Sequence, residues 1–506
     1  MAVFDPLPLG QRIPGGPHSV SCSLPTMRAV RGYEEKDPEV MRALSSGYPR
    51  FVVHPFARRL TEHLVSSDPG LRGRGLWLTP SGRAAARLAE HLGPGSGARL
   101  FRSEGLEGVS HPGSADLAAR AKTYLQNTGG FLSSRQAEDQ LVRLGLLAVA
   151  QTESLFPGDA EACVRADLRG AMPAAADADL FLAPCGMNAM WAAFRAAAGL
   201  QAARGRPVWL QLGWLYLDTI AILQRFTGAT GNHIHVRDPL DLEAIARLLT
   251  DHPERIAGVI AEVPTNPLIQ TPDLPALGEL CRRHGAALIV DPSIASIHNV
   301  DVLPHADLVV SSLTKYSARE GDLTAGVVAV NPAGRDAAAL RAAVPRELEP
   351  VYPRDLSRLA AQIGGTRDTL ERIHANTARV ASFLRSHPAI AEVRWALQPG
   401  CAGNFERIAH RPGATGGVIT FTLRRKGGLE PFYDRLRLPK GPSFGMTTTL
   451  ICPFMYLAHY DLVTTPSGLA ELAASGVDPD LLRLCCGTEP AEEIVGALNE
   501  ALEAVT

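Results

Sequence analysis

The chain has 506 residues, of which 46% are hydrophobic and 20% are charged, ordinary values for a globular protein that exclude a mostly disordered chain. Its 50 basic and 52 acidic residues give a net charge of −2, which excludes the basic surface typical of a nucleic-acid-binding protein. No apolar run approaches the roughly 18 residues that a membrane span needs, and the N-terminus lacks the basic start of a signal peptide. The eight cysteines are scattered, so we expect a reduced, soluble, cytoplasmic protein.

The sequence divides into four predicted segments. Residues 1–65 form an N-terminal arm whose first 45 residues are rich in proline and glycine and mostly irregular. Residues 66–175 form a helical or mixed insertion, with a loop at 93–97 between helices and a helical pattern over 137–151. Residues 176–340 form a large domain. Residues 341–506 form a smaller C-terminal α/β domain with a long helical stretch over 352–384 and a closing helix over 490–505.

The large domain contains short apolar runs that alternate with helical stretches. The runs cover residues 179–184, 207–212, 258–263, 287–291, 307–312 and 325–330. The helical stretches include 187–203 and 274–285, and the second ends at Gly285, a residue type suited to the position after a helix. Alternating apolar strands and helices predict an α/β fold with a mostly parallel sheet covered on both faces.

The residues that follow these strands carry the predicted chemistry, because ligands of an open α/β sheet bind at the carboxyl ends of its strands. Successive strand ends hold Gly186 and Met187 before a helix, then Trp214 and Tyr216, then Asn266, Asp291 and the segment 311–316 around Lys315. A helix start can hold a phosphate, an aromatic and a carboxylate suit a nitrogen-containing ring, and a lysine can form a Schiff base. Together these parts predict a pyridoxal-phosphate site.

Each of these residues also has a purely structural explanation. Lys315 alone is typical of a solvated surface lysine, and Asp291 of a cap or turn residue. Tyr216 suits the core, and Asn266 before a proline suits a common turn. Only their joint occurrence, in order, at successive strand ends favours the cofactor.

Motifs along residues 47–506 match a known pattern in order. They are GYPRFVVH (47–54), CGM (185–187), YLDT (216–219), EVPTNP (262–267), the segment from Asp291 to Tyr316, and LLRLCCGTEPAEEIVGALNEAL (481–502). Taken together, they resemble the Cys/Met-metabolism family of pyridoxal-phosphate-dependent enzymes, and most of all its fungal-type cystathionine γ-synthases. The resemblance implies a fold-type I transferase, with a cofactor-binding large domain and a smaller C-terminal α/β domain.

The resemblance implies a cofactor-binding role for each matching residue. Lys315 forms the Schiff base and moves protons, and Tyr216 stacks on the ring and assists proton transfer. Asp291 pairs with the pyridinium nitrogen, and Asn266 contacts the ring hydroxyl. The phosphate is held by Gly186, Met187, Ser312 and Thr314.

The resemblance also implies contacts with a second subunit and with the substrate. Tyr48 and Arg50 reach the phosphate of a neighbouring subunit, which implies a homodimer or a dimer of dimers with shared active sites. Arg483 binds the substrate carboxylate through its planar, always-charged fork. Ser443 and Thr449 lie in a substrate-facing loop. The partners are therefore a small amino-acid substrate and further copies of the chain, with no nucleic acid or membrane.

The chain departs from the family pattern in its substrate loops. The loop after Lys315 reads YSAREGD, Cys485 stands where serine is usual, and a long insertion separates Arg50 from Gly186. The expected reaction is a γ-replacement on an activated homoserine-type amino acid, through a vinylglycine-type intermediate and with a thiol such as L-cysteine as nucleophile. The alternative is a specialised-metabolism enzyme in which the same intermediate, drawn from S-adenosylmethionine, reacts with a carbon nucleophile. The sequence leaves both open.

Two further readings are weaker. Residues 441–445 fit G-x-S-x-G around Ser443, but a hydrolase elbow needs a helix after the serine, and a strand-like stretch follows here. His233 and His235 fall on one face of a strand pattern, and two histidines without a third ligand are weak evidence for a metal. We expect no metal.

Overall fold

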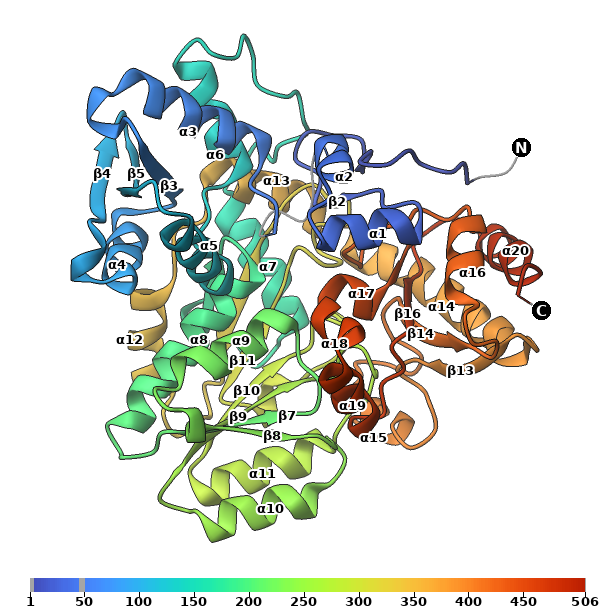
Figure 1. The fold of residues 1–506 in the computed structure, drawn as a ribbon. Coiled ribbons are helices and arrows are strands. Elements are labelled where there is room, and N and C mark those ends of the chain that lie inside the picture. The colour runs from blue at the N-terminus through green and yellow to red at the C-terminus, as the bar shows by residue number, and fades with distance from the viewer. Residues whose placement is uncertain (1–3, 45–50, 506) are drawn as a thin grey trace.

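The computed structural model describes residues 4–44 and 51–505. Figure 1 shows a central α/β domain, the C-terminal domain to one side of it and the insertion to the other. The N-terminal arm crosses the molecule to lie beside the C-terminal domain. The central domain therefore contacts regions that come from both ends of the chain.

The described residues of the central domain form a seven-stranded sheet in the order β6-β12-β11-β10-β9-β7-β8. Strands β7 to β11 pair in parallel, and β12 runs antiparallel to both of its neighbours. The prediction of a mostly parallel sheet is confirmed. The strands are β6 (Leu180–Ala183), β7 (Val208–Leu212), β8 (His233–Val236), β9 (Ile256–Glu262), β10 (Ala287–Asp291), β11 (Leu308–Ser311) and β12 (Gly326–Val330).

Helices cover both faces of this sheet because alternate strand residues point to opposite sides. Val259 and Ala261 of β9 face a core shared with α7 (Ala160–Ala171), α10 (Leu242–Asp251), α11 (Leu274–His284) and α13 (Pro353–Ile363). Ile260 faces a second core with α8 (Gly186–Ala202), α9 (Leu217–Phe226) and α12 (Ala337–Glu347). Helix α11 ends before Gly285, which has a left-handed φ of 66° as its glycine predicts.

The C-terminal domain has a four-stranded antiparallel sheet in the order β13-β14-β16-β15 among the described residues. The helical stretch expected over 352–384 is two helices, α13 and α14, because Gly364 and Gly365 interrupt it. The elements are α14 (Thr366–Ser386), β13 (Ile390–Arg394), α15 (Ala402–Glu406), β14 (Val418–Leu423), α16 (Leu429–Arg435), β15 (Leu450–Pro453), α17 (Phe454–Ala458), α18 (Tyr460–Thr464), α19 (Pro466–Ala474), β16 (Leu482–Cys485) and α20 (Ala491–Leu502).

The N-terminal arm is more regular than predicted. It contains β1 (Arg12–Ile13), β2 (Ser21–Cys22), α1 (Met27–Glu34) and α2 (Pro38–Ala43). The Ala29 N–H donates to the Thr26 side chain, which caps α1, and Asp37 caps α2. Met27, Val30 and Tyr33 share a core with the C-terminal domain. This shared core explains why a segment rich in proline and glycine is ordered.

The insertion has hydrophobic cores of its own. An antiparallel sheet of β3 (Arg74–Thr79), β5 (Leu106–Pro112) and β4 (Arg99–Ser103) packs with α4 (Gly82–Leu92), α5 (Ala115–Thr128) and α6 (Ser134–Arg143). Helix α3 (Pro55–Ser67), most of which belongs to the arm, packs on the same sheet. Residues 93–97 join α4 to strand β4 rather than joining two helices. Helix α6 is shorter than its apolar pattern, because Gly145 takes a left-handed φ of 70° and ends it.

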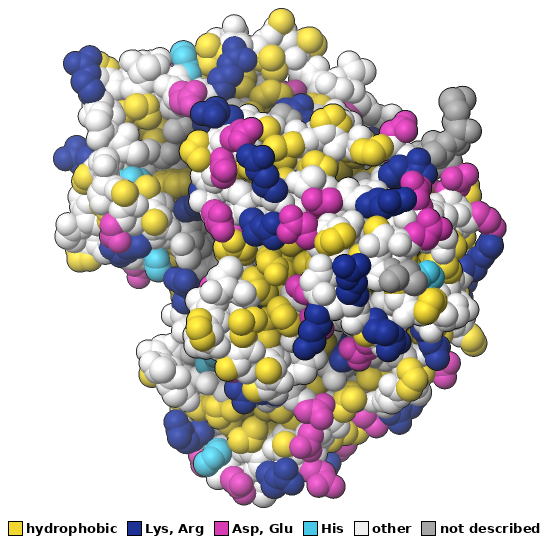
Figure 2. Space-filling view, turned by 45° about the vertical axis from the view of Figure 1, so that its right-hand side comes forward, with side chains coloured by type: hydrophobic (Ala, Val, Ile, Leu, Met, Phe, Trp, Pro, Cys, Tyr) yellow, Lys and Arg dark blue, Asp and Glu magenta, His cyan; other side chains and the backbone are white. Residues whose placement is uncertain are grey.

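The surface carries charges of both signs. Figure 2 shows basic and acidic side chains interspersed over one face of the molecule, with hydrophobic side chains gathered near its middle. None of the helices that the structure describes combines the length and the apolar composition needed to cross a bilayer.

Candidate active site

One cavity at the carboxyl ends of the central strands collects most of the predicted site residues. It is lined by Gly186, Met187, Tyr216, Asn266, Asp291, Ser312, Lys315, Ser443 and Arg483. The first seven come from the central domain, and the last two come from the C-terminal domain. The cavity therefore lies where these two domains meet, as expected for a ligand of an open α/β sheet.

Lys315 follows β11 and is 8% exposed. Its Nζ donates a hydrogen bond to Ser443 Oγ at 2.7 Å and lies 4.8 Å from the centroid of the Phe444 ring. The backbone also ties the two segments together, because the Tyr316 N–H donates to the Gly445 carbonyl at 2.7 Å. The lysine is thus held in a fixed place inside the cavity by a loop of the other domain.

Two carboxyl groups lie side by side on neighbouring strands. Asp291 of β10 is in register with Glu262 of β9. Burial raises the pKa of Asp291 to about 6, although the Ser293 N–H donates to its carboxylate at 2.9 Å. Burial and the neighbouring Asp291 raise the pKa of Glu262 well above its usual value, and its carboxylate accepts a hydrogen bond from the Tyr216 N–H. This corner of the cavity is therefore short of positive charge.

The turn between β6 and α8 approaches the loop after β11 very closely. A Cβ atom added to Gly186 would lie 2.7 Å from Ser312 Cβ, so only glycine fits there. The Asn188 N–H donates to Cys185 Sγ, which caps α8, and the Ser312 N–H donates to Ser293 Oγ. The N-terminus of this 17-residue helix opens into the cavity and can donate to an anion.

Arg483 of β16 is 7% exposed and forms the opposite wall. Its Nη1 donates to Asn266 Oδ1 and its Nη2 to the Ser443 carbonyl, both at 3.4 Å. The guanidinium carbon lies 4.5 Å from the Phe454 ring centroid. Both hydrogen bonds are long, so the guanidinium is oriented but can still make a bidentate contact with a ligand carboxylate.

The remaining wall of the cavity is apolar. It is formed by Phe51, Leu217, Phe444, Phe454, Leu457 and Ala458. The last three belong to α17, so the C-terminal domain supplies much of this wall. Such a wall excludes water and favours a ligand group that needs no hydrogen bonds.

Two predicted residues of the described chain, Thr314 and Thr449, do not line the cavity. The Thr314 hydroxyl is buried against the backbone of Ala325, accepting from its N–H at 3.0 Å. The Thr449 hydroxyl donates to Glu489 at 2.7 Å. Tyr48 and Arg50 fall outside the described residues, so their predicted phosphate contact stays a prediction.

Several side chains at this site were not predicted from the sequence. Glu262 pairs with Asp291 across neighbouring strands, and the Ser293 N–H donates to Asp291. Phe444 contacts both Lys315 and Arg483, and Phe454 contacts Arg483. The position of Glu262 at the end of an apolar run was a usable signal, because Asp291 was found in that way. The two phenylalanines gave no such signal, since aromatic residues are common in cores.

In the part of the chain that it describes, the structure does not provide what a serine hydrolase or a histidine metal site would require. Within the described chain, strand β15 rather than a helix follows Ser443, so the turn of a hydrolase elbow does not form there. His233 bonds to the Gln211 side chain and His235 to the Gly213 carbonyl. Among the described residues, no group of three or more potential ligands is placed to hold a metal ion.

The residues of the cavity fit pyridoxal phosphate. No lysine or arginine of the described chain acts on the pKa of the buried Asp291, so a protonated ring nitrogen would supply the missing positive charge. The N-terminus of α8 opens into the cavity beside the Ser312 hydroxyl, and together they suit a phosphate. The primary amine of Lys315 lies in the same cavity and suits a Schiff base.

Comparisons with known proteins agree with this fit. A family model described as Cys/Met metabolism PLP-dependent enzyme matches residues 167–503. An L-2-amino-4-chloropent-4-enoate dechlorinase/desaturase of Streptantibioticus cattleyicolor is 40% identical, with 97% of each chain covered. A cystathionine gamma-synthase of Neurospora crassa is 26% identical, with 99% of each chain covered.

The fold has a matching solved structure. A cystathionine gamma-lyase from Lactobacillus plantarum, complexed with L-serine, superposes with a TM-score of 0.59 at 19% identity, covering 71% of this chain and 92% of the other. The expected fold-type I architecture, the cofactor and the resemblance are thereby confirmed. The chain belongs to the Cys/Met-metabolism family of pyridoxal-phosphate-dependent enzymes.

Proposed function

We propose that this enzyme removes a leaving group from Cγ of an α-amino acid by elimination, and that the leaving group is a small one such as chloride. The observation that carries the proposal is the cavity itself, in which Lys315 and Arg483 lie opposite an apolar wall. The cofactor, when bound, supplies an electron sink that makes the protons next to the amino group acidic. The rest of the reaction depends on side chains of this chain.

Each side chain has one task in the proposed reaction. Arg483 binds the substrate carboxylate, which orients the amino acid with its Cα next to Lys315. Lys315 takes a proton from carbon, and Ser443 Oγ holds its Nζ in place. The carboxylate of Asp291 keeps the cofactor nitrogen protonated. Chloride leaves with the electron pair of the carbon–chlorine bond, and the loss of one proton and one chloride adds one unsaturation to the product.

The charges of the cavity favour elimination over replacement by a second amino acid. Among the described lining residues, the basic side chains are Lys315 and Arg483, and Lys315 is needed for the cofactor. The described lining thus offers one guanidinium for one carboxylate, which matches a reaction of a single amino-acid substrate. The apolar wall suits a vinylic or halogenated side chain. The name of the 40% identical relative, a dechlorinase and desaturase, supports the same reaction class.

Chloride release tests the proposal. The purified enzyme with pyridoxal phosphate is incubated with L-2-amino-4-chloropent-4-enoate, and free chloride and the mass of the product are measured. We expect chloride and a product lighter than the substrate by one HCl. A parallel reaction with O-acylhomoserine and cysteine serves as the comparison. Turnover of the second pair alone would overturn the proposal.

The second candidate is thiol γ-replacement of the cystathionine γ-synthase type. It is favoured by the cystathionine gamma-synthase of Neurospora crassa, which matches along 99% of each chain. Formation of cystathionine from the acylated homoserine and cysteine would establish it. Turnover of S-adenosylmethionine with a carbon nucleophile would identify the third alternative.

The proposal extends to a homodimer, or a dimer of dimers, with shared active sites. Its support is the resemblance of residues 47–54 to the family motif, in which the residues at the positions of Tyr48 and Arg50 reach a neighbouring subunit. Mixing an Arg50→Ala chain with a Lys315→Ala chain tests it. If each site takes these residues from different subunits, the mixture regains activity that neither variant has. A mixture as inactive as its components would show unshared sites.

A further inference from the structure

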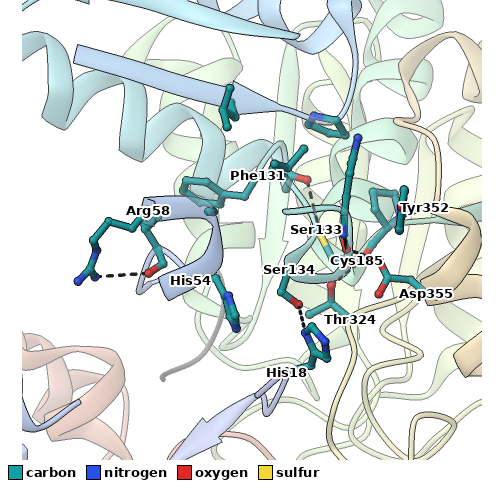
Figure 3. A pocket seen from close by; sticks show the side chains of 18 of the residues that line it. His18, His54, Arg58, Phe131, Ser133, Ser134, Cys185, Thr324, Tyr352 and Asp355 are labelled. Carbon is teal, nitrogen blue, oxygen red and sulfur yellow. Dashed lines mark hydrogen bonds between the residues drawn. The ribbon is translucent and has the colours of Figure 1, made fainter. Parts of the chain in front are cut away.

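The insertion meets the central domain across a second cavity. This cavity, of about 260 Å³, is lined by Trp77 and Phe131 on the insertion side and by Cys185 and Thr324 on the other side. Figure 3 shows side chains from both sides pointing into the space between them. Close apolar packing is therefore interrupted at this boundary, and the regions must be joined by contacts at its edge.

A buried arginine makes the contact at that edge. Arg135, near the start of α6, is 1% exposed. Its guanidinium donates to Glu153 at 2.6 Å and to the Asp355 carboxylate at 3.1 Å, and Nη1 donates to the Asp322 carbonyl at 2.9 Å. Its Nη2 also lies 3.4 Å from the Asp322 carboxylate. The three acidic residues come from three separate segments, so one side chain of the insertion joins them all.

Asp322 lies in the loop that follows Lys315, and this loop is held from its other side as well. Arg358 Nε donates to the Asp322 carboxylate at 2.8 Å, and Gln362 Nε2 donates to the same carboxylate at 2.8 Å. The Gln362 side chain also accepts from the Glu320 N–H at 2.9 Å. The loop is thus fixed through both its side chains and its backbone.

The loop around Asp322 also contacts the loop that contains Ser443, the residue that accepts a hydrogen bond from Lys315. Thr447 lies four residues beyond Ser443, and its N–H donates to the Arg319 carbonyl at 2.9 Å. The Ser443 Oγ in turn accepts from Lys315 Nζ. A Cβ atom added to Gly321 would lie 2.1 Å from Met446 Sδ, so the two loops touch. Displacement of the Asp322 loop would change the distance between Lys315 and Ser443.

We propose that Arg135 is a positioning residue, through which the insertion fixes the loop after Lys315 and so the place of the lysine amine. Arg135 does not line the cofactor cavity and acts through Asp322. The inference rests on the role proposed for Lys315. It gives the insertion a function in the reaction, because removal of one member of a buried charge network leaves the others unbalanced.

The test compares two arginines of the same helix. Arg135→Met removes the buried guanidinium at nearly constant volume, whereas Arg143→Met removes an exposed one, whose pair with Glu104 is about half exposed on both sides. Asp322→Asn breaks the network from the loop side and decides the question if Arg135→Met does not fold. The holoenzymes are compared by cofactor release, by the pH titration of the visible absorbance of lysine-bound cofactor, and by kcat and KM.

We expect Arg135→Met and Asp322→Asn to shift the absorbance titration, to release cofactor faster, and to lose up to about 10-fold in kcat with little change in KM. Arg143→Met should match the wild type. Folded Arg135→Met and Asp322→Asn enzymes with wild-type titration and kcat would overturn the inference, and so would an equal loss in Arg143→Met. Peptide mapping after borohydride distinguishes the two failures. Cofactor attached to a lysine other than Lys315 would overturn both proposals, whereas attachment at Lys315 with wild-type titration and kcat in both variants would overturn the positioning inference alone.

Discussion

Two cavities lie on either side of the turn at Cys185 and Gly186, and they treat buried charge differently. In the cofactor cavity, Asp291 is buried without a basic partner among the described residues, and its pKa is raised to about 6. In the cavity beside the insertion, burial also raises the pKa of Asp355, but its carboxylate accepts a hydrogen bond from Arg135 at 3.1 Å. A buried carboxylate without a cationic partner indicates a missing ligand, whereas a buried ion pair indicates a contact that holds two regions together. Substitutions in the two cavities should therefore have different signatures.

The largest difference is expected between two buried lysines. Lys315→Ala should lower kcat by about 10⁴-fold, because the base and the point of cofactor attachment are both removed. Lys440 is 5% exposed, its Nζ donates to the Pro25 carbonyl at 2.8 Å, and burial lowers its pKa to about 8, yet it does not line the cavity. Lys440→Met should keep the cofactor. Borohydride reduction followed by mass spectrometry measures both variants, and loss of attachment in the Lys440 variant would reverse the assignment.

Arg483→Met should lower kcat/KM by about 100-fold, since a buried charge-assisted contact with the substrate is lost. Cofactor binding should persist, because Arg483 comes from the C-terminal domain, whereas the residues expected to hold the cofactor come from the central domain. The measurement compares an amino-acid substrate with its carboxamide. The wild type should prefer the acid strongly, and the variant should not. An undiminished preference in the variant would place the carboxylate elsewhere.

The cofactor cavity was largely predictable from sequence, and the second cavity was not. Lys315, Asp291 and Asn266 follow apolar strands, so topology alone brings them to one edge of the sheet. Arg135 and Asp322 are 187 positions apart, and nothing local in either segment indicates the other. Thr314 shows the limit of motif reasoning, because its hydroxyl bonds the backbone of Ala325 instead of lining the cavity. Pairing across long separations depends on tertiary packing, which one sequence does not report.

The Asp291→Asn substitution should change the free energy of unfolding in opposite directions without and with bound cofactor. The raised pKa means that the folded cofactor-free protein binds this proton up to about pH 6, whereas the unfolded chain loses it near pH 4. Stability of the cofactor-free protein therefore falls as pH rises between these values. The variant has no such loss, so it should be more stable by up to about 3 kcal/mol at pH 8 and by only about 1 kcal/mol at pH 4.5.

With pyridoxal phosphate bound, the sign should reverse, because the carboxylate then has a cationic partner. Denaturant unfolding at both pH values, with and without cofactor, provides the four measurements. A variant that is less stable than the wild type at pH 8 without cofactor would contradict the idea that this corner of the cavity lacks positive charge.

The smallest effect is expected from a matched pair at Ser443, whose φ of 95° lies in the left-handed region that favours glycine. Ser443→Gly and Ser443→Ala both remove the Oγ that accepts from Lys315 Nζ, but only glycine relieves the backbone. Both should therefore lower kcat by a similar factor of about 10, the size expected for one hydrogen bond to a charged group. The glycine variant should be about 1 kcal/mol more stable than the alanine variant in urea unfolding.

A kcat that differs between the Ser443→Gly and Ser443→Ala enzymes would mean that backbone strain, not the hydroxyl, positions the lysine. The effect of the insertion through Asp322 would then act on the loop conformation itself, since the Thr447 N–H ties that loop to the Arg319 carbonyl. Equal kcat values with unequal stability would instead locate the positioning in the Lys315–Ser443 hydrogen bond. The two Ser443 variants thus show whether the contacts of Arg135 act on Lys315 through the backbone conformation of the loop or through the hydrogen bond to Ser443.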